Sequence, residues 1–146
     1  MFKNVLSVIL GYVVMVILVV SLYTGIMMAL GTETIYSAPG SWVPSDLWSA
    51  LSLVVGLVAA LGGGWVCFAI AKQVKPLLWL MGLVGVLGAM TVATAATTAP
   101  PSEPRPANIT PMDAAEKSVT PVPVAIGHVL VGLVGVFAVY KLKSKP

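Results

Sequence analysis

The sequence predicts an all-α integral membrane protein whose four transmembrane helices form two antiparallel hairpins. Two observations carry this prediction. Hydrophobic residues make up 58% of the 146-residue chain and charged residues only 9%, whereas a soluble domain has about 25% charged residues. Four long apolar stretches also lack Asp, Glu, Lys and Arg, and each is near the ~20 residues that a helix needs to cross a hydrocarbon core. We expect a single membrane domain, since the length leaves no room for a second, soluble one.

The predicted spans cover residues 5–30, 47–71, 77–96 and 124–140. The first is the longest, at about 39 Å for 1.5 Å per residue, so it must tilt or protrude from the bilayer. Ser45 or Asp46 is placed to cap the second span. Residues 72–76 form a tight inner turn, and Pro76 suits the first turn of the third span.

Two longer loops, residues 31–46 and 97–123, are predicted on the outer side. The second loop holds seven of the eleven prolines, so its first part should be extended. The run Thr110-Pro111-Met112-Asp113 then indicates a helix start, with a Thr cap and Pro at the first position. A short surface helix is therefore expected from Thr110 to about Ser118.

Charge distribution predicts the orientation. All five acids lie in the two longer loops, whereas the N-terminus, the 72–76 turn and the tail 141–146 carry only bases, namely Lys3, Lys72, Lys75, Lys141, Lys143 and Lys145. Cytoplasmic segments are enriched in Lys and Arg, so both termini are predicted in the cytoplasm, with the protein in a plasma membrane such as the bacterial inner membrane. The net charge of +3 then favours contact with lipid headgroups, not nucleic acid.

Aromatic residues fit the same frame. Trp42 and Trp48 fall at the outer interface, and Trp79 and Tyr140 lie near the inner lysines. Trp and Tyr favour membrane interfaces because their rings are amphipathic, so these four are predicted interfacial anchors.

Small residues recur at helical spacing on three of the spans. Such rows let helix backbones approach closely in lipid, where they drive association. They are more numerous than one four-helix bundle needs, which predicts a helix-packing and partner interface made by other integral membrane subunits or by self-association. The residues of this interface are Gly56, Ala60, Gly64 and Gly63 on the second span, Gly82, Gly85 and Ala89 on the third, and Gly132 and Gly135 on the fourth.

His128 is the only histidine and lies about one turn into the fourth span. An ionisable residue at membrane depth is a functional candidate. Three alternatives stay open: a neutral hydrogen-bonded residue between helices, a contact with a partner or its cofactor, or a redox or metal ligand. A haem would need a second ligand, for which Met27, Met28 or Met90 are placed on the outer side. No cofactor or metal of the chain's own is predicted, although bound lipid is expected.

The first functional hypothesis is a non-catalytic accessory subunit of a larger membrane complex, such as an energy-transducing one. The alternative is a small homo-oligomeric channel or carrier for a small solute or lipid, in which His128, Tyr23 and the Ala/Thr-rich stretch 91–98 line an outward cavity. That stretch is only weakly apolar, so we expect protein or a polar crevice to cover it. A third possibility, a lipid-modifying enzyme, would have to use Glu103, Asp113 or Glu116 at the interface. No catalytic set is evident in the sequence, so no enzyme is predicted.

Overall fold

The structure is a computed structural model that describes residues 2–106, 109–110, 113 and 117–144. Its helices are α1 (Phe2–Leu30), α2 (Thr32–Ile35), α3 (Asp46–Ala71), α4 (Lys75–Thr97) and α6 (Val122–Ser144). Four of them, α1, α3, α4 and α6, are long and apolar enough to cross a membrane, and the described residues contain no β-strand beyond one isolated bridge. The prediction of an all-α chain with four such helices is confirmed. The four apolar helices suggest a multi-pass membrane protein.

Local sequence signals set several helix ends. The Ser45 hydroxyl accepts a hydrogen bond from the Trp48 amide at 3.2 Å, so Ser45 is the N-cap of α3. Lys72 ends α3 in the left-handed conformation with φ 57°, and Pro76 lies in the first turn of α4. The surface helix predicted after Thr110 falls mainly on residues 111–112 and 114–116, which lie outside the described residues.

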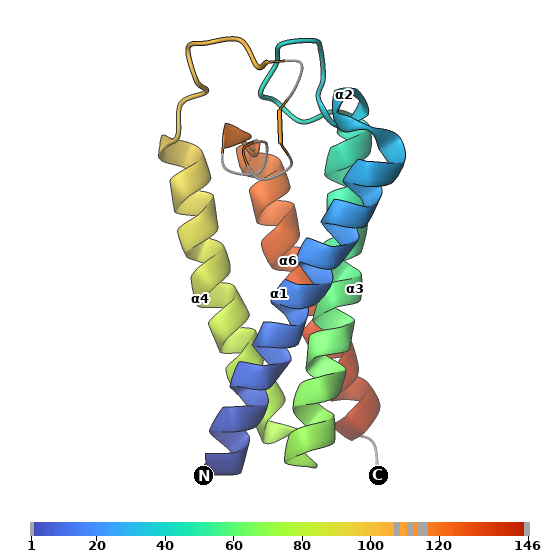
Figure 1. Cartoon of the computed structure of the whole chain (residues 1–146). Coiled ribbons are helices and arrows are strands. Elements are labelled where there is room, and N and C mark those ends of the chain that lie inside the picture. The colour runs from blue at the N-terminus through green and yellow to red at the C-terminus, as the bar shows by residue number, and fades with distance from the viewer. Residues whose placement is uncertain (1, 107–108, 111–112, 114–116, 145–146) are drawn as a thin grey trace.

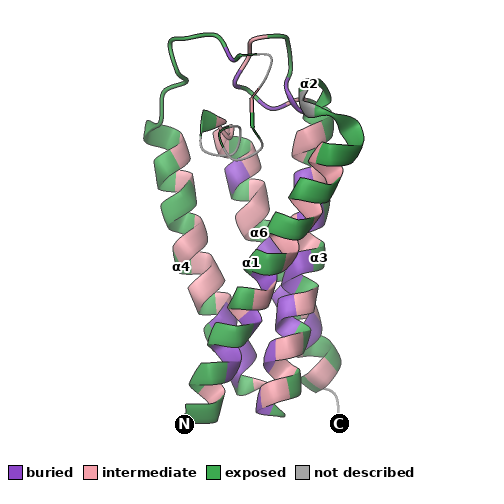
Figure 2. Ribbon diagram, viewed as in Figure 1, coloured by how far each residue is buried: buried purple, intermediate pink, exposed green. Residues whose placement is uncertain are grey.

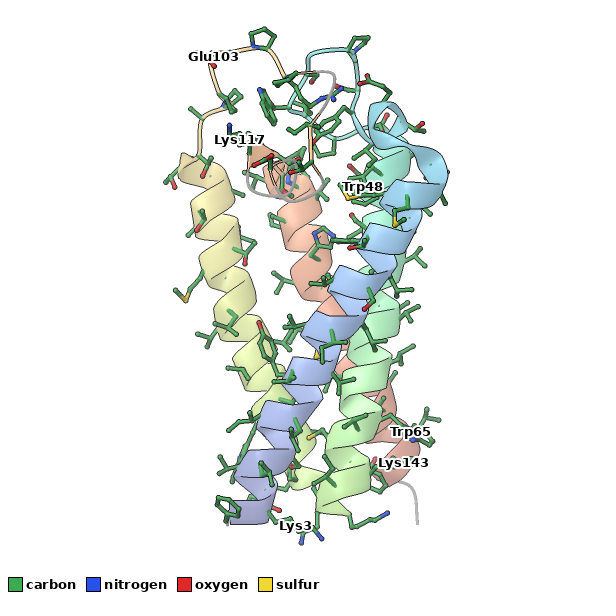
Figure 3. All side chains as sticks on the ribbon, in the orientation of Figure 1. Lys3, Trp48, Trp65, Glu103, Lys117 and Lys143 are labelled. Carbon is green, nitrogen blue, oxygen red and sulfur yellow. The ribbon has the colours of Figure 1, made fainter. Side chains whose placement is uncertain are left out.

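The N-terminal end of α1 and the C-terminal end of α6 lie at one end of the bundle, together with the turn at residues 72–74 (Figure 1). We call this the terminal end, and we call the opposite end, which carries residues 31–45 and the described residues 98–106, 109–110, 113 and 117–121, the loop end. Lys3 and Lys143 lie at the terminal end, whereas Glu103 and Lys117 lie at the loop end (Figure 3). The long helices extend past the predicted apolar runs, so the charged residues next to those runs sit at helix ends.

Helix α3 is the central helix, because it packs extensively against both α1 and α6, whereas α4 packs mainly against α6. Helices α3 and α4 are joined by a tight turn and still make few contacts with each other. The reason lies in the small residues of α3, which face α1 and α6. A Cβ added to Gly63 would meet the Gly11 carbonyl of α1 at 2.5 Å, and one added to Gly135 of α6 would meet the Ala60 Cβ at 2.5 Å.

The apolar core is concentrated towards the terminal end, where buried residues gather on all four long helices (Figure 2). Leu77 and Leu80 of α4 and Val136 of α6 are fully buried there. Towards the loop end α4 becomes exposed, and the helices enclose cavities there instead of a close-packed core. The larger of these two cavities lies in the loop half of the bundle.

Candidate functional site: a cavity at the loop end

A cavity of about 590 Å³ opens between α1, α3, α6 and the loop segments that follow α1 and precede α6. This volume is typical of a small-molecule site, which binds through apolar walls and a few placed polar groups. No charged side chain lines it among the described residues. The lining residues are Val20, Tyr23, Thr24, Met27, Ile35, Tyr36, Pro44, Trp48, Ser49, Ser52, Thr110, Ser118, Thr120, Val124 and His128.

A hydrogen-bonded pair, Ser52 of α3 and His128 of α6, lies in the wall of this cavity. The Ser52 hydroxyl donates to the Ser49 carbonyl at 2.7 Å, and its Oγ lies 2.9 Å from His128 Nε2. Because the one hydroxyl proton is already engaged with Ser49, the second bond takes its proton from Nε2. The hydrogen-bond pattern thus assigns the Nε2–H tautomer, and Nδ1 of a neutral ring is an acceptor.

Tyr23 of α1 completes the group. Its hydroxyl interacts with the Ser52 side chain, and its ring lies 5.2 Å from the Trp48 ring. Ser52 then donates one bond to Ser49 and accepts one from His128. The cavity lining offers further polar groups to a ligand, namely His128 Nδ1 and the hydroxyls of Tyr23, Thr24 and Thr120.

A serine within 2.9 Å of a histidine also invites comparison with a nucleophile and its general base. In that arrangement the serine gives its proton to the imidazole. Here the proton points to Ser49, and the side chain of Ser52 is buried within α3. The geometry is that of a binding group, in which the serine holds the histidine ring in place.

A second cavity of about 340 Å³ lies between α1, α3, α4 and α6, and it shares Val20, Tyr23 and His128 with the first. Its other lining residues are nearly all apolar, among them Val16 of α1, Val84 and Leu87 of α4, and Val129 of α6. The two cavities therefore meet at the Tyr23 and His128 side chains.

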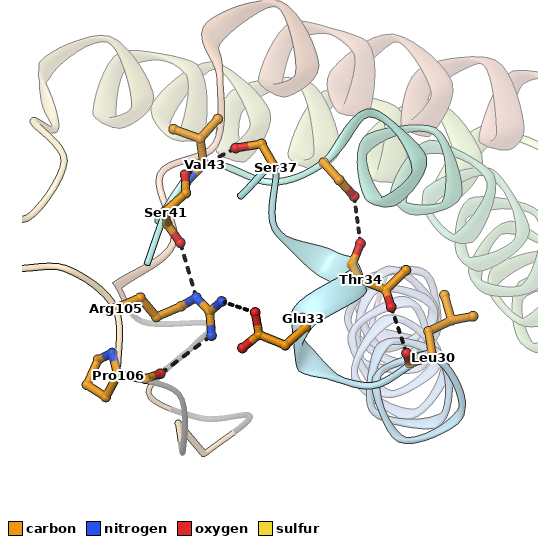
Figure 4. Close-up of polar contacts among 9 residues, drawn as sticks. Leu30, Glu33, Thr34, Ser37, Ser41, Val43, Arg105 and Pro106 are labelled. Carbon is orange, nitrogen blue, oxygen red and sulfur yellow. Dashed lines mark hydrogen bonds and ion pairs between the residues drawn. The ribbon is translucent and has the colours of Figure 1, made fainter. Parts of the chain in front are cut away.

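The loop segments form a cap over the loop end, held by Arg105. Its guanidinium donates to the Ser41 carbonyl at 3.1 Å and pairs with Glu33 at 3.0 Å (Figure 4). It also lies 4.2 Å from the centre of the Tyr36 ring. The Arg105 side chain is only 1% exposed, while that of Glu33 is 60% exposed. Arg105 thus ties the two loops together and fixes Tyr36, which lines the first cavity.

The environment of Tyr36 changes its acidity. Burial raises the pKa of the Tyr36 phenol above its ordinary value of 10.0, and the Arg105 charge and a hydrogen bond with Ser118 offset this only in part. Tyr36 therefore stays protonated at physiological pH.

The predicted interfacial anchors differ in where the structure places them. Trp42 is 6% exposed within the cap, where its indole N–H donates to the Glu103 carbonyl at 2.8 Å. Trp48 is half-buried and lines the first cavity, with its ring 5.2 Å from the Tyr23 ring. Trp79 is 42% exposed near the terminal end, and Tyr140 packs beside Phe137 with their ring centres 6.1 Å apart.

The predicted small-residue interface is used largely inside the chain. Gly63 faces α1, and a row of small residues on the neighbouring face of α3, Gly56, Ala60 and Gly64, lies against α6. Gly85 and Gly132 contribute to the α4–α6 contact. Only Gly82 and Ala89, on α4, remain exposed. Gly135 of α6 lies opposite the row on α3.

The Ala/Thr-rich end of α4 differs from expectation. Residues 93–94 and 96–98 are exposed in this chain, and the Thr94, Thr97 and Thr98 hydroxyls donate to backbone carbonyls of their own helix. Such internal bonds satisfy the hydroxyls without covering protein. Of the stretch 91–98, Thr91 lines the second cavity, and the expected lining by the other residues is not found.

The remaining candidates are placed as follows. Met27 lines the first cavity with His128, whereas Met28 is 79% and Met90 62% exposed. Glu103 and Asp113 are exposed at the loop end, and Glu116 lies outside the described residues. Among the residues described, no group of three His, Cys, Asp or Glu side chains is placed to hold a metal ion.

Comparison with known proteins gives no relative: no family model, no curated protein and no solved structure matches this chain.

Proposed function

We propose that this protein is a non-catalytic membrane protein that binds a small amphipathic molecule in the loop-end cavity, as a carrier or receptor would. The observation that carries the proposal is the cavity itself, about 590 Å³ with apolar walls around the Tyr23, Ser52 and His128 group. The buried core cluster towards the terminal end supports it, because none of its residues lines this cavity, which is therefore separate from the close-packed part of the bundle.

We also propose the orientation in the membrane. The described lysines of the terminal end, Lys3, Lys72, Lys75, Lys141 and Lys143, stand without a neighbouring acid in the sequence. This charge pattern favours cytoplasmic termini in a plasma membrane such as the bacterial inner membrane. The cavity then opens on the outer side, and a ligand reaches it from the outer leaflet or the external medium.

Thermal unfolding of the purified protein with a panel of neutral, cationic and anionic amphipathic compounds tests binding. A ligand at 100 times its Kd stabilises the folded protein by about 2.7 kcal/mol. Val124→Trp fills the cavity from α6 and should abolish this stabilisation, because Val124 lines it. Val134→Trp is the matched control, since Val134 is 59% exposed on the same helix and lines neither cavity. If every compound acts equally on both variants, or none binds, the proposal is wrong.

A second function, accessory subunit of a membrane complex, is favoured by one face of α4. Gly82, Val86 and Ala89 are exposed there at helical spacing, and a Cβ added to Gly82 would meet nothing within 4 Å. This flat face would let a helix of another chain approach closely.

Purification in mild detergent separates the two functions. Gly82→Leu should release a stoichiometric partner from the α4 face. Gly25→Leu should not, although Gly25 on α1 is equally open, with nothing within 4 Å of an added Cβ. Migration of the wild-type chain as a lone monomer would count against the subunit function.

A further inference from the structure

We infer that the ligand is an uncharged lipid with a free hydroxyl group, whose headgroup binds beside Tyr23 and His128 and whose chain lies in the second cavity, between α1 and α4. The inference rests on the proposed function and specifies the class of ligand. Diacylglycerols and prenols are lipids of this kind.

The charge of the headgroup follows from the cavity lining. Among the described residues, neither cavity is lined by Asp, Glu, Lys or Arg. Arg105, a buried cation of the cap, is already paired with Glu33 and packs over the Tyr36 ring. An ionised phosphate would lose its hydration here without gaining a partner, so an uncharged headgroup is favoured.

The hydroxyl follows from proton accounting. Ser52 uses its proton on Ser49 and receives that of His128 Nε2. Nδ1 of the neutral His128 ring is therefore an acceptor, and the Tyr23 oxygen in the same lining can accept as well. A hydroxyl brings the donor that Nδ1 needs, whereas a quinone ring carries only carbonyl acceptors and would leave Nδ1 unmatched.

The chain follows from the way the cavities join. The second cavity continues from Tyr23 and His128 along Val16, Val84 and Leu87 towards the middle of the bundle. Helices α1 and α4 make few contacts with each other, and their residues Val20 and Thr91 line the cavity while remaining exposed. The cavity is therefore open to the bilayer between these helices, which gives a membrane-dissolved lipid a lateral entry.

Photo-crosslinking tests the inference in nanodiscs of phosphatidylcholine. The probe is a diacylglycerol with a diazirine on one acyl chain, and the readout is the labelled peptide. Label should appear on α1 near Val16 and on α4 near Leu87. Unlabelled diacylglycerol should compete, with phosphatidic acid and a short-chain ubiquinone each at least about 10-fold weaker, since each loses a hydrogen bond or buries a charge.

Two matched pairs of variants test the residues. Val20→Trp blocks the junction of the cavities and should abolish labelling, whereas Val13→Trp, at a 42% exposed position of α1 outside both cavities, should not. Tyr23→Phe removes one acceptor and should weaken competition by about 5-fold, whereas Tyr140→Phe should have no effect.

Equal or better competition by phosphatidic acid or ubiquinone would overturn the inference, as would labelling that Val20→Trp leaves intact. If diacylglycerol fails while another amphipathic compound still stabilises the protein in a manner sensitive to Val124→Trp, the proposed function stands and the ligand class is wrong. Val20 lies on an exposed surface, so its substitution tests the site without disturbing the buried core.

Discussion

Gly135→Ala should destabilise the bundle even though alanine is the better helix former. In an exposed helix position the exchange of Gly for Ala gains about 1 kcal/mol. At Gly135 the new Cβ would lie 2.5 Å from the Ala60 Cβ and 3.3 Å from the Leu57 carbonyl oxygen, so α3 and α6 must move apart. Overpacking of this kind costs about 1–3 kcal/mol. Gly82→Ala, on the open face of α4, supplies the matched control and should stabilise.

The assay is reversible unfolding in mixed micelles, followed by circular dichroism. We expect Gly135→Ala to be about 2 kcal/mol less stable than Gly82→Ala, the difference being the steric term alone. A double variant that also carries Ala60→Gly moves the methyl group to the other helix and should recover at least about 1 kcal/mol of coupling. Equal stability of the two single variants, or no recovery in the double variant, would refute the packing of α3 on α6 described above.

Three further outcomes are expected. Arg105→Leu should strongly speed amide hydrogen exchange in the cap, with a loss of about 3 kcal/mol in the free energy of local opening. Glu33→Gln should cost less than about 1 kcal/mol, because Glu33 is mostly exposed. Equal effects of the two variants would contradict the buried role of Arg105. The raised pKa of Tyr36 adds cap stability that is fully present below about pH 10 and is lost as pH rises through the higher folded-state pKa, so Tyr36→Phe should remove a late-titrating component from the phenolate absorbance. Nitrogen NMR should find the Nε2–H tautomer at His128, and Ser52→Ala, which deprives Nε2–H of its acceptor, should shift that equilibrium and cost about 1–3 kcal/mol; a proton on Nδ1 in the wild-type protein would contradict the assignment.

The helices themselves could be predicted from the sequence because the cause of each is local. A run of apolar residues long enough to cross the bilayer has to be helical, since lipid offers no other partner for its backbone. The Ser45 cap and the position of Pro76 are local for the same reason. In each case the residue itself and its neighbours in the chain determine the local backbone structure, and the sequence contains all of that information.

The partners of the helices are a different matter. A row such as Gly56, Ala60 and Gly64 predicts that one face of a helix is packed closely, but it contains nothing that names the opposite helix. Gly63, one residue away, faces α1, while Gly64 faces α6. A shift of one residue turns a helix position by about 100°, so adjacent glycines necessarily serve different neighbours.

The cavity could be predicted from the sequence only in part. His128 stands out as the single histidine, but its partner Ser52 lies 76 residues away and looks like an ordinary serine bonded to its own helix. One signal was present: Ser45, Ser49 and Ser52 recur at helical spacing on an otherwise apolar span, which marks a polar face at its start. Arg105 gave no comparable signal, because its burial depends on carbonyls supplied by the other loop.

The internal packing of the small residues bears on the choice between the two proposed functions. Small residues at unusual density predict a partner only if they exceed what the chain itself consumes. In this structure the small residues of α3 lie against α1 and α6, those of α6 lie against α3 and α4, and among the predicted interface residues only Gly82 and Ala89 of α4 remain exposed. An open Cβ position on a lipid-facing helix is compatible with a partner but does not require one, because lipid chains fill such a surface. The loop-end cavity is different, since polar groups from α1, α3 and α6 converge on it within a membrane protein, where unmatched polar groups are costly. The cavity therefore carries more weight than the exposed face, and ligand binding is the function to test first.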